Sequence, residues 1–392
     1  MTSPAFSRRV PGQLTPNRIA AARRRCAGRF VDLTVSNPTE CGFEYPPDLL
    51  LSLGEPAGLS YRPDPLGLAS AREAVSSLSG ELGVPVDPAH IVLTASTSEA
   101  YTFLFKLLCD PGDAVLVPTP SYPLFEHLAQ LEGVRALPYS LREEGGWSLD
   151  LDELSTAPPD VRAVVIVHPN NPTGSLVRQE DAAALEHLCA TRGWALIADE
   201  VFLAFPLEPT SMPRSFAGRE RALTFTLGGL SKLTALPQLK LAWIITSGPS
   251  PAREAALQRL EFIADTFLSV ATPVQLALPC LLRHGAWVRD QIRARCRHNL
   301  DELRRHLASL PAVTVPRVEG GWSVVVRVPS LGSEEDLVLS LLEQFGVAVH
   351  PGYFFEFPRD GYLVTSLLPT PEKFLLGAQR LAAGLGAWLD GA

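Results

Sequence analysis

Short apolar runs alternate with helix-length segments along most of this chain. Apolar runs of about four to eight residues are typical of buried strands, and their alternation with amphipathic helices is typical of a doubly wound sheet. The pattern therefore predicts an α/β fold with a doubly wound, mostly parallel sheet. The predicted strands are residues 91–94, 114–117, 134–137, 163–167, 195–198, 223–227 and 239–246, and the intervening helices include 69–78, 98–108 and 179–192.

From residue 251 onward the pattern changes to long helices and a few short strands. With 392 residues, of which 46% are hydrophobic, the chain can bury more than one core. We predict a large domain, residues 46–284, and a smaller α+β domain formed by the N-terminal arm and the C-terminal part, residues 1–45 plus 285–392. The small domain is expected to contain helices at 17–26, 287–310, 334–345 and 371–388, an extended run at 30–35, and strands at 313–315 and 323–328.

Charge and cysteine usage narrow the classes of partner. A net charge of -8 argues against a nucleic-acid-binding surface, and no apolar run has the length of a membrane span. The six cysteines have no CxxC spacing, so neither a metal site nor a disulfide framework is predicted. No targeting segment is recognised at the N-terminus. We therefore expect a cytoplasmic protein with a small-molecule ligand, and no nucleic acid or membrane as partner.

Ligands of an open parallel sheet bind beyond the carboxyl ends of the strands. At one such end stands Lys232, after an apolar run and the glycine pair Gly228 and Gly229. A desolvated lysine amine can attack an aldehyde and form a Schiff base, and glycines allow the backbone to approach a cofactor closely. At another end stand Asp199 and Glu200, where a buried carboxylate needs a cation or several donors. Taken alone, Lys232 is equally consistent with a solvated loop lysine.

Three further strand ends carry polar or aromatic residues. The hydroxyl-rich turn 94–100 opens a helix whose free N–H groups favour a phosphate, although plain helix capping also explains it. Tyr122 can stack on a planar ring or belong to the core. Asn171, in a turn with prolines and a glycine, can donate to a ring oxygen or simply form the turn.

Together, these residues resemble the class I/II aminotransferases, which are pyridoxal-phosphate enzymes of fold type I, like aspartate aminotransferase. The resemblance spans nearly the whole chain, and its motifs occur in the family's order. They are Tyr61 with Gly67, the turn 94–100, residues 120–123, residues 171–174, Asp199 with Glu200, and Ser231 with Lys232.

The resemblance implies a role for each matching residue. Lys232 would form the Schiff base with pyridoxal 5'-phosphate and later move a proton, and Asp199 would pair with the ring nitrogen. Asn171 would bond the ring hydroxyl oxygen, and Tyr122 would stack on the ring. Ser231 lies in the cofactor-binding motif, backbone groups of Ser96, Thr97 and Ser98 would hold the phosphate, and Tyr61 would reach the phosphate of the neighbouring subunit in a homodimer with shared active sites.

Four positions depart from the family's pattern. Phe202 stands where a tyrosine usually bonds the ring oxygen, Gly229 where a serine often holds the phosphate, and Lys240 where an arginine usually binds it. Val364 stands where the family usually has the arginine that grips the substrate carboxylate. Losing a neutral hydrogen bond costs about 1 kcal/mol, whereas a desolvated carboxylate without its cation costs several. We therefore expect Phe202 to tune the cofactor and Val364 to alter substrate recognition.

Two arginines are candidates to replace the missing one, Arg327 and Arg62, and the sequence does not choose between them. Aromatic residues near the same predicted strand are candidates for a substrate wall, with ordinary core packing as the alternative. They are Trp322, Tyr353, Phe354, Phe355 and Phe357.

The residues and the resemblance favour an aminotransferase that moves an amino group between a primary amine or amino acid donor and a carbonyl acceptor. The same cofactor also serves a lyase, a decarboxylase or a cyclase, since the pocket selects which bond breaks. A catalytically silent module that binds pyridoxal phosphate is the third alternative.

Overall fold

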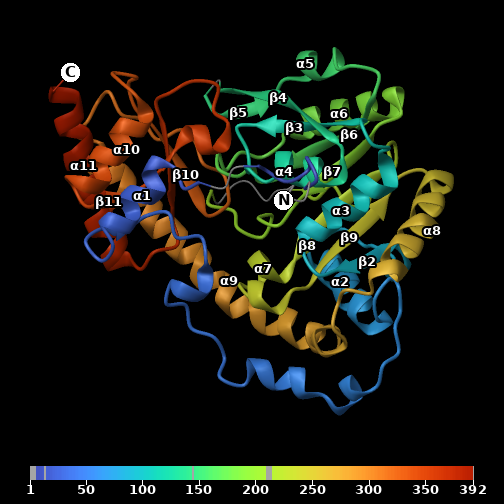
Figure 1. The fold of residues 1–392 in the computed structure, drawn as a ribbon. Coiled ribbons are helices and arrows are strands. Elements are labelled where there is room, and N and C mark those ends of the chain that lie inside the picture. The colour runs from blue at the N-terminus through green and yellow to red at the C-terminus, as the bar shows by residue number, and fades with distance from the viewer. Residues whose placement is uncertain (1–5, 13–14, 144, 209–213, 392) are drawn as a thin grey trace, which may run out of the picture.

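The computed structural model describes residues 6–12, 15–143, 145–208 and 214–391. An eight-stranded sheet in the order β2-β9-β8-β7-β6-β3-β4-β5 forms its centre (Figure 1). Strand β9 runs antiparallel to both of its neighbours and β5 antiparallel to β4, while the other neighbouring pairs are parallel. The predicted mostly parallel α/β sheet is therefore confirmed. The strands are β2 (Ile91–Thr94), β3 (Ala114–Thr119), β4 (Arg135–Glu143), β5 (Trp147–Leu149), β6 (Val161–Val167), β7 (Ala195–Asp199), β8 (Thr224–Gly229) and β9 (Ala242–Ser247).

The central strands are apolar along their whole length because helices cover both faces of the sheet. In β6, Val165 and Val167 belong to one buried cluster and Val164 and Ile166 to another, as the alternation of side chains along a strand requires. The first cluster includes residues of α3, α4 and α8, and the second includes residues of α6. The helices of this part are α2 (Ala69–Glu81), α3 (Thr97–Leu108), α4 (Phe125–Glu132), α5 (Leu151–Ser155), α6 (Gln179–Arg192), α7 (Leu230–Leu233) and α8 (Ser250–Phe267).

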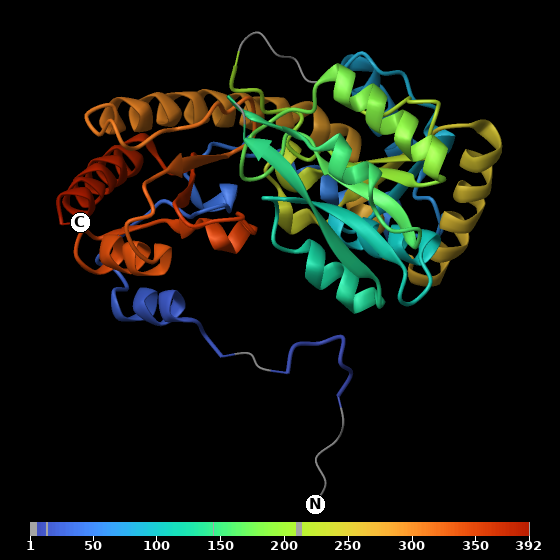
Figure 2. The same ribbon diagram turned by 90° about the horizontal axis from the view of Figure 1, so that it is seen from above.

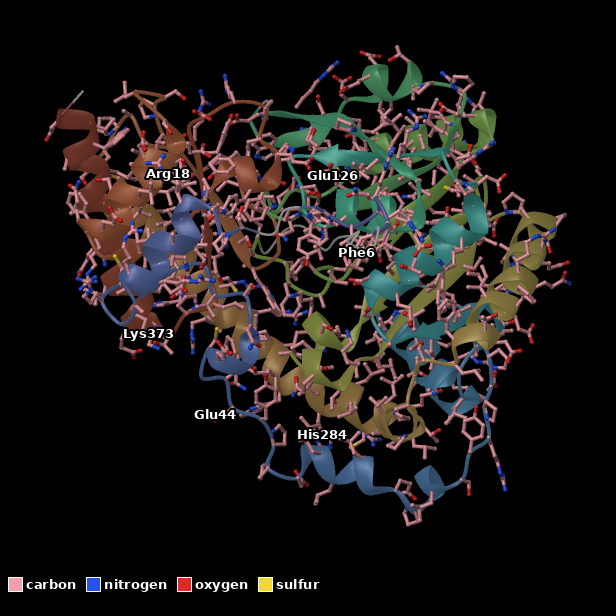
Figure 3. The ribbon with its side chains drawn as sticks, viewed as in Figure 1. Phe6, Arg18, Glu44, Glu126, His284 and Lys373 are labelled. Atoms are coloured by element: carbon pink, nitrogen blue, oxygen red, sulfur yellow. The ribbon has the colours of Figure 1, made fainter. Side chains whose placement is uncertain are left out.

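A second, smaller part combines the N-terminal arm with the C-terminal residues. Strand β1 of the arm pairs in parallel with β11, and Arg18 of α1, labelled in Figure 3, forms ion pairs with Glu335 and Asp336 of α10. These contacts confirm the predicted small α+β part. Its elements are α1 (Arg18–Arg25), α10 (Glu334–Glu343), α11 (Pro371–Asp390), the pair β1 (Val31–Asp32) and β11 (Val347–Ala348), and the antiparallel sheet β10 (Ser323–Arg327), β13 (Tyr362–Ser366) and β12 (His350–Pro351).

One long helix, α9 (Thr272–Leu307), runs along both parts, as Figure 2 shows. Gly285 packs against Thr234 near α7, and the Asn299 side chain donates to the carbonyl oxygens of Leu367 and Pro369. The predicted boundary between residues 284 and 285 falls inside this helix. The prediction of a helix from residue 287 began too late, because Pro279 lies inside α9 and a proline inside a helix argues against it in sequence. Burial of residues such as Leu278 and Leu281 outweighs that cost.

Two other predicted elements differ from the structure. Residues 313–315 form no strand, because only Thr314 bridges to Arg327. The strand predicted from residue 239 begins at Ala242, since Lys240 adopts a left-handed conformation that ends the ladder. The short 3-10 helices are η1 (Pro38–Glu40), η2 (Leu49–Gly54), η3 (Pro56–Leu59), η4 (Pro88–His90), η5 (Pro237–Leu239) and η6 (Gly352–Phe355).

Gly174 joins the turn after β6 to the segment that leads into β10. Its carbonyl oxygen accepts from the N–H groups of Glu319 and Gly320, and its φ of +68° lies in the left-handed region. A Cβ at this position would lie 2.6 Å from the carbonyl oxygen of Gly320. The large sheet and β10 are therefore held together at a position that requires glycine.

We expect Gly174→Ala to lower the free energy of unfolding by on the order of 2 kcal/mol more than Gly193→Ala does. Gly193 is the matched control because it has a similar φ of +69° but nothing within 4 Å of its Cβ position. Both variants carry the left-handed strain, and only Gly174→Ala adds the clash with the backbone. Denaturant titration of the two variants measures the difference, and equal losses would contradict the proposed contact.

Candidate functional site

A cavity of about 170 Å³ lies where the carboxyl ends of β6, β7 and β8 face the sheet of β10 and β13. Its wall combines residues of the large sheet, such as Asp199 and Lys232, with Trp322, Ser323 and Ser366 of the smaller part. The ends of parallel strands are the expected ligand site of such a sheet. We therefore take this cavity as the candidate active site.

Lys232 lies on the one-turn helix α7, directly after β8. The N–H of Leu230 donates to the carbonyl oxygen of Leu241, which fixes the start of α7 against the neighbouring segment. The glycine pair before it also allows a close approach within the sheet. A Cβ at Gly228 would lie 2.5 Å from the indole nitrogen of Trp243, and one at Gly229 would lie 2.9 Å from the Cβ of Ala242. The glycines therefore allow the close approach of β9, and Gly229 also lines the cavity.

The surroundings of Lys232 favour a neutral amine. Its Nζ lies 5.2 Å from the ring centroid of Trp322 and 5.7 Å from that of Phe202. Burial lowers the pKa of Lys232, and the negative charge of Asp199 opposes that effect. An amine with a lowered pKa is more often unprotonated and is a better nucleophile.

Asp199 is the last residue of β7 and is buried. One carboxylate oxygen accepts from the hydroxyl of Tyr101 at 3.1 Å, and the other accepts from the N–H of Val201 at 3.2 Å. Burial raises the pKa of Asp199 to about 6, and the two hydrogen bonds and the charge of Lys232 act in the opposite direction. The carboxylate is thus oriented and ready to pair with a cationic group in the cavity.

Sequence reasoning missed Tyr101. It lies on the buried face of α3, and its ring packs edge-on against Phe125. In sequence, a tyrosine among apolar residues is indistinguishable from an ordinary core residue, and only the fold brings its hydroxyl to Asp199. The one available indication was that a buried tyrosine hydroxyl usually needs a hydrogen-bond partner.

The N-terminus of α3 opens toward the cavity. Thr97 and Ser98 line it, and the first N–H groups of a helix have no acceptor within the helix. The hydroxyl of Ser96 instead caps the helix by accepting from the N–H of Glu99, so its side chain does not line the cavity. Helix capping therefore explains Ser96, and phosphate binding by the start of α3 stays a prediction.

Four other predicted residues also line the cavity: Tyr122, Asn171, Phe202 and Ser231. Tyr122 is 43% exposed, so its ring is not core. Phe202 is buried and packs edge-on against Trp322, with ring centroids 5.4 Å apart. The cavity thus contains most of the residues that the sequence assigned to it.

Two predicted cofactor residues lie elsewhere. Tyr61 is 78% exposed and lines a separate surface pocket with Ser269 and other residues of that loop. Lys240 is exposed and does not line the cavity. Neither residue reaches the site of its own chain in this structure.

The proposed replacements for the missing arginine are also outside the cavity. Arg327 forms an ion pair with Glu143 at 3.5 Å, and Arg62 lines the same surface pocket as Tyr61. Val364 itself is buried with Val325 in an apolar cluster. That cluster also holds Phe355 and Phe357.

Of the aromatic residues considered for a substrate wall, only Trp322 lines the cavity. Phe357 stacks on Tyr362 with ring centroids 4.4 Å apart, and Phe354 contacts the rings of Tyr353 and His350. Core packing therefore explains Phe354, Phe355 and Phe357, and the sequence could not separate them from Trp322 because all five are near the same strands.

The donor set of the cavity fits pyridoxal phosphate. A buried carboxylate suits the ring nitrogen, an amine of lowered pKa suits the aldehyde, and the start of α3 suits the phosphate. Among the described residues, no group of three or more His, Cys, Asp and Glu side chains could hold a metal ion. No helix in the described ranges has the length and apolar character needed to cross a membrane.

Comparison with known proteins places this fold and sequence in context. The profile of the family described as aminotransferase class I and II matches residues 48–370. The chain is 26% identical to the glutamate-pyruvate aminotransferase AlaA of Haemophilus influenzae, with 90% of each chain covered. It is 27% identical to the alanine aminotransferase of Mycobacterium bovis, with 92% of this chain and 87% of the relative covered.

The solved structures agree in fold. An aminotransferase from Escherichia coli superposes with a TM-score of 0.86 at 22% identity, covering 98% of this chain and 99% of the other. A single mutant of Thermus thermophilus aspartate aminotransferase gives a TM-score of 0.84 at 24% identity, covering 97% and 100%. The predicted fold type I architecture is therefore confirmed.

Glu200 follows Asp199 and is buried behind the cavity wall. Its carboxylate accepts from the hydroxyl of Ser215 and the N–H of Phe216. Burial raises the pKa of Glu200 from 4.5 to about 7, and the two hydrogen bonds oppose this effect. Since the folded pKa is raised, the stability that Glu200 contributes is present below about pH 4.5 and is lost as pH rises through about 7.

We therefore expect the Glu200→Gln protein to gain stability relative to the wild type as pH rises from 4.5 to 8. The difference in unfolding free energy between the two proteins should change by on the order of 2 to 3 kcal/mol over this window. Denaturant titrations at several pH values measure it. Ser215→Ala removes one donor and should steepen the pH dependence; a pH-independent difference for Glu200→Gln would refute the assignment.

Proposed function

The chain belongs to the class I and II aminotransferases, and we propose that it moves an amino group between a primary amine or amino acid and a carbonyl acceptor with pyridoxal 5'-phosphate as its cofactor. The observation that carries the proposal is the convergence of Asp199, Lys232 and the start of α3 on one cavity. The relatives named as aminotransferases support amino transfer over the other reactions of this cofactor.

The proposed roles follow from the position of each group. Asp199 holds the ring nitrogen in its protonated form, and the Tyr101 hydroxyl keeps that carboxylate in place. The first N–H groups of α3 bind the phosphate, Tyr122 covers the ring, and Asn171 bonds its oxygen. When bound, the cofactor withdraws electrons from the carbon that bears the amino group and so weakens the bonds to that carbon.

Lys232 is proposed to hold the cofactor and to carry the proton. Its Nζ is partly desolvated between the rings of Phe202 and Trp322, so the amine can accept a proton and deliver it again. Phe202 has no hydroxyl to offer the cofactor. These rings also limit the access of water to the site.

We further propose a homodimer with shared sites. Tyr61 is exposed and does not line the cavity of its own chain. Large apolar side chains are also exposed in the segment before Tyr61 and on α8 and α9. Such exposure marks an interaction surface. These side chains are Leu50, Leu51, Leu59, Phe262, Phe267 and Trp287.

Two predictions from sequence complete the proposal. We propose that residues 46–284 form the cofactor-binding domain and that residues 1–45 plus 285–392 form the second domain. A cytoplasmic location remains a prediction that cell fractionation can test.

The function is tested by half-reactions. The loaded protein should be yellow, lose that colour with an amine donor while the matching carbonyl product forms, and regain it with a carbonyl acceptor. Borohydride reduction and peptide mapping should then place the label on Lys232. Lys240→Ala is the control and should keep the label, whereas a label on Lys106, Lys240 or Lys373, or release of a different product, would contradict the proposal.

Shared sites are tested by mixing inactive chains. Tyr61→Phe and Lys232→Ala should each be poorly active alone, and refolding them together should restore part of the activity, because one site of the hybrid has neither change. Asp199→Asn mixed with Lys232→Ala is the matched control, since both changes affect the same chain's contribution and no intact site can form from them. Equal activity of both mixtures would count against shared sites.

A further inference from the structure

The charge inventory of the cavity wall constrains the substrate. Asp199 and Lys232 are the charged residues among those that line the cavity in the described part of the chain. Both are committed to the cofactor under the proposed function. The remaining wall residues carry no charge, so none of the described residues of the same chain places a guanidinium in this wall to hold an anionic substrate group.

The packing of β10, β12 and β13 explains why this wall carries no further charge. Val364 is only 2% exposed, and it lies opposite Val325 on β10 and His350 on β12. Its side chain is part of an apolar cluster that includes Phe355. Arg327, two residues further along β10, is paired with Glu143 on the outer side.

Three of the serines that line the cavity come from the arm and the small sheet. Ser323 and Ser366 are directly opposite each other on β10 and β13, and Ser36 comes from the N-terminal arm. Backbone bonds hold the three segments together, because the N–H of Ser366 donates to Leu33 and that of Leu367 to Trp322. The Ser366 oxygen accepts from the N–H of Leu368, so its own O–H is available to donate.

Trp322 adds an aromatic surface beside these hydroxyls. The residue is only 3% exposed, and its indole Nε1 is enclosed by protein atoms, so a molecule in the cavity meets the ring and not the N–H. The flanking rings of Phe202 and Phe205 fix the indole in place.

We propose that this site takes primary amines whose carbon next to the amino-bearing carbon carries a neutral oxygen group, with amino alcohols and their carbonyl products as the substrate class. The inference rests on the proposed function and deepens it. Ser323 and Ser366 bind the substrate oxygen, and the rings of Phe202 and Trp322 contact the apolar remainder. A hydroxyl can donate and accept among these groups, whereas a carboxylate loses its hydration here and gains no cation.

The negative charge of the bound cofactor would strengthen the selection. The cofactor phosphate would repel a substrate carboxylate, and the low dielectric of the cavity would weaken the screening of that repulsion. A neutral alcohol meets no such repulsion. The wall therefore discriminates by charge as well as by hydrogen bonding.

Binding is tested with two ligands that differ in one group, 2-amino-2-methyl-1-propanol and 2-aminoisobutyrate. Neither has a hydrogen on the amino-bearing carbon, so affinity can be measured calorimetrically on the loaded enzyme without transfer of that proton. We expect the alcohol to bind at least roughly tenfold more tightly. Equal or tighter binding of the carboxylate would overturn the inference.

Turnover is tested with the pairs alaninol and alanine, and phenylalaninol and phenylalanine. The alcohols should convert the cofactor faster than the acids in each pair. If no amine of any kind is converted, the proposed function fails, while the binding comparison still decides the substrate class. If the acids react faster, the proposed function stands and this inference falls; loss of that preference in Arg62→Ala would then identify a partner's arginine as the cation.

The wall hydroxyls are tested by Ser323→Ala. The Ser323 hydroxyl makes no hydrogen bond within the described residues, so its removal should not unfold the protein. The change should reduce the affinity for 2-amino-2-methyl-1-propanol by about three- to tenfold and leave that for 2-aminoisobutyrate nearly unchanged. Ser330→Ala is the matched control, because Ser330 donates to Asp360 away from the cavity and its loss should change neither affinity. Equal losses for both ligands would argue against hydrogen bonding to the substrate oxygen.

Discussion

Burial of two opposite charges at the ends of neighbouring strands is the constraint on which the site depends. Asp199 ends β7 beside Leu227 of β8, and Lys232 follows β8 by one turn of helix. Neither charge is tolerated in an apolar interior without compensation. Tyr101 and the backbone N–H of Val201 donate hydrogen bonds to the Asp199 carboxylate. Desolvation lowers the pKa of Lys232, which favours its uncharged form. The chemistry of the site is thus a consequence of how the fold accommodates this pair.

The fold was largely predictable because the buried strands of a parallel sheet are apolar along their whole length. The strands that sequence missed or misplaced lack that property. Strand β5 (Trp147–Leu149) is a three-residue edge strand, and residues 313–315 contribute a single bridge. Helix α9 began earlier than predicted because tertiary packing overrides the local cost of Pro279.

The same reasoning explains which site residues could be found. Residues placed just after predicted strands, such as Asp199, Asn171 and Lys232, follow from the sheet alone. Ser36, Ser323 and Ser366 reach the cavity only because three distant segments fold over it, and isolated serines carry no pattern in sequence. The glycine pair before Lys232 is a different case. The sequence predicted that something approaches these glycines closely, but it could not show that β9 is one of the approaching segments.

Under the proposed function, different sheets serve cofactor binding and substrate recognition. Residues at the ends of the large sheet would hold the cofactor, and β10 and β13 would supply the wall that meets the substrate. A substitution in β13 could then change recognition without disturbing Asp199 or Lys232. The valine at 364 is not an isolated change, however, because Val325, Phe355 and Phe357 share its apolar cluster. An arginine restored there would bury a guanidinium among apolar side chains at a cost of several kcal/mol. The neutrality of this wall is thus built into the packing of the small sheet.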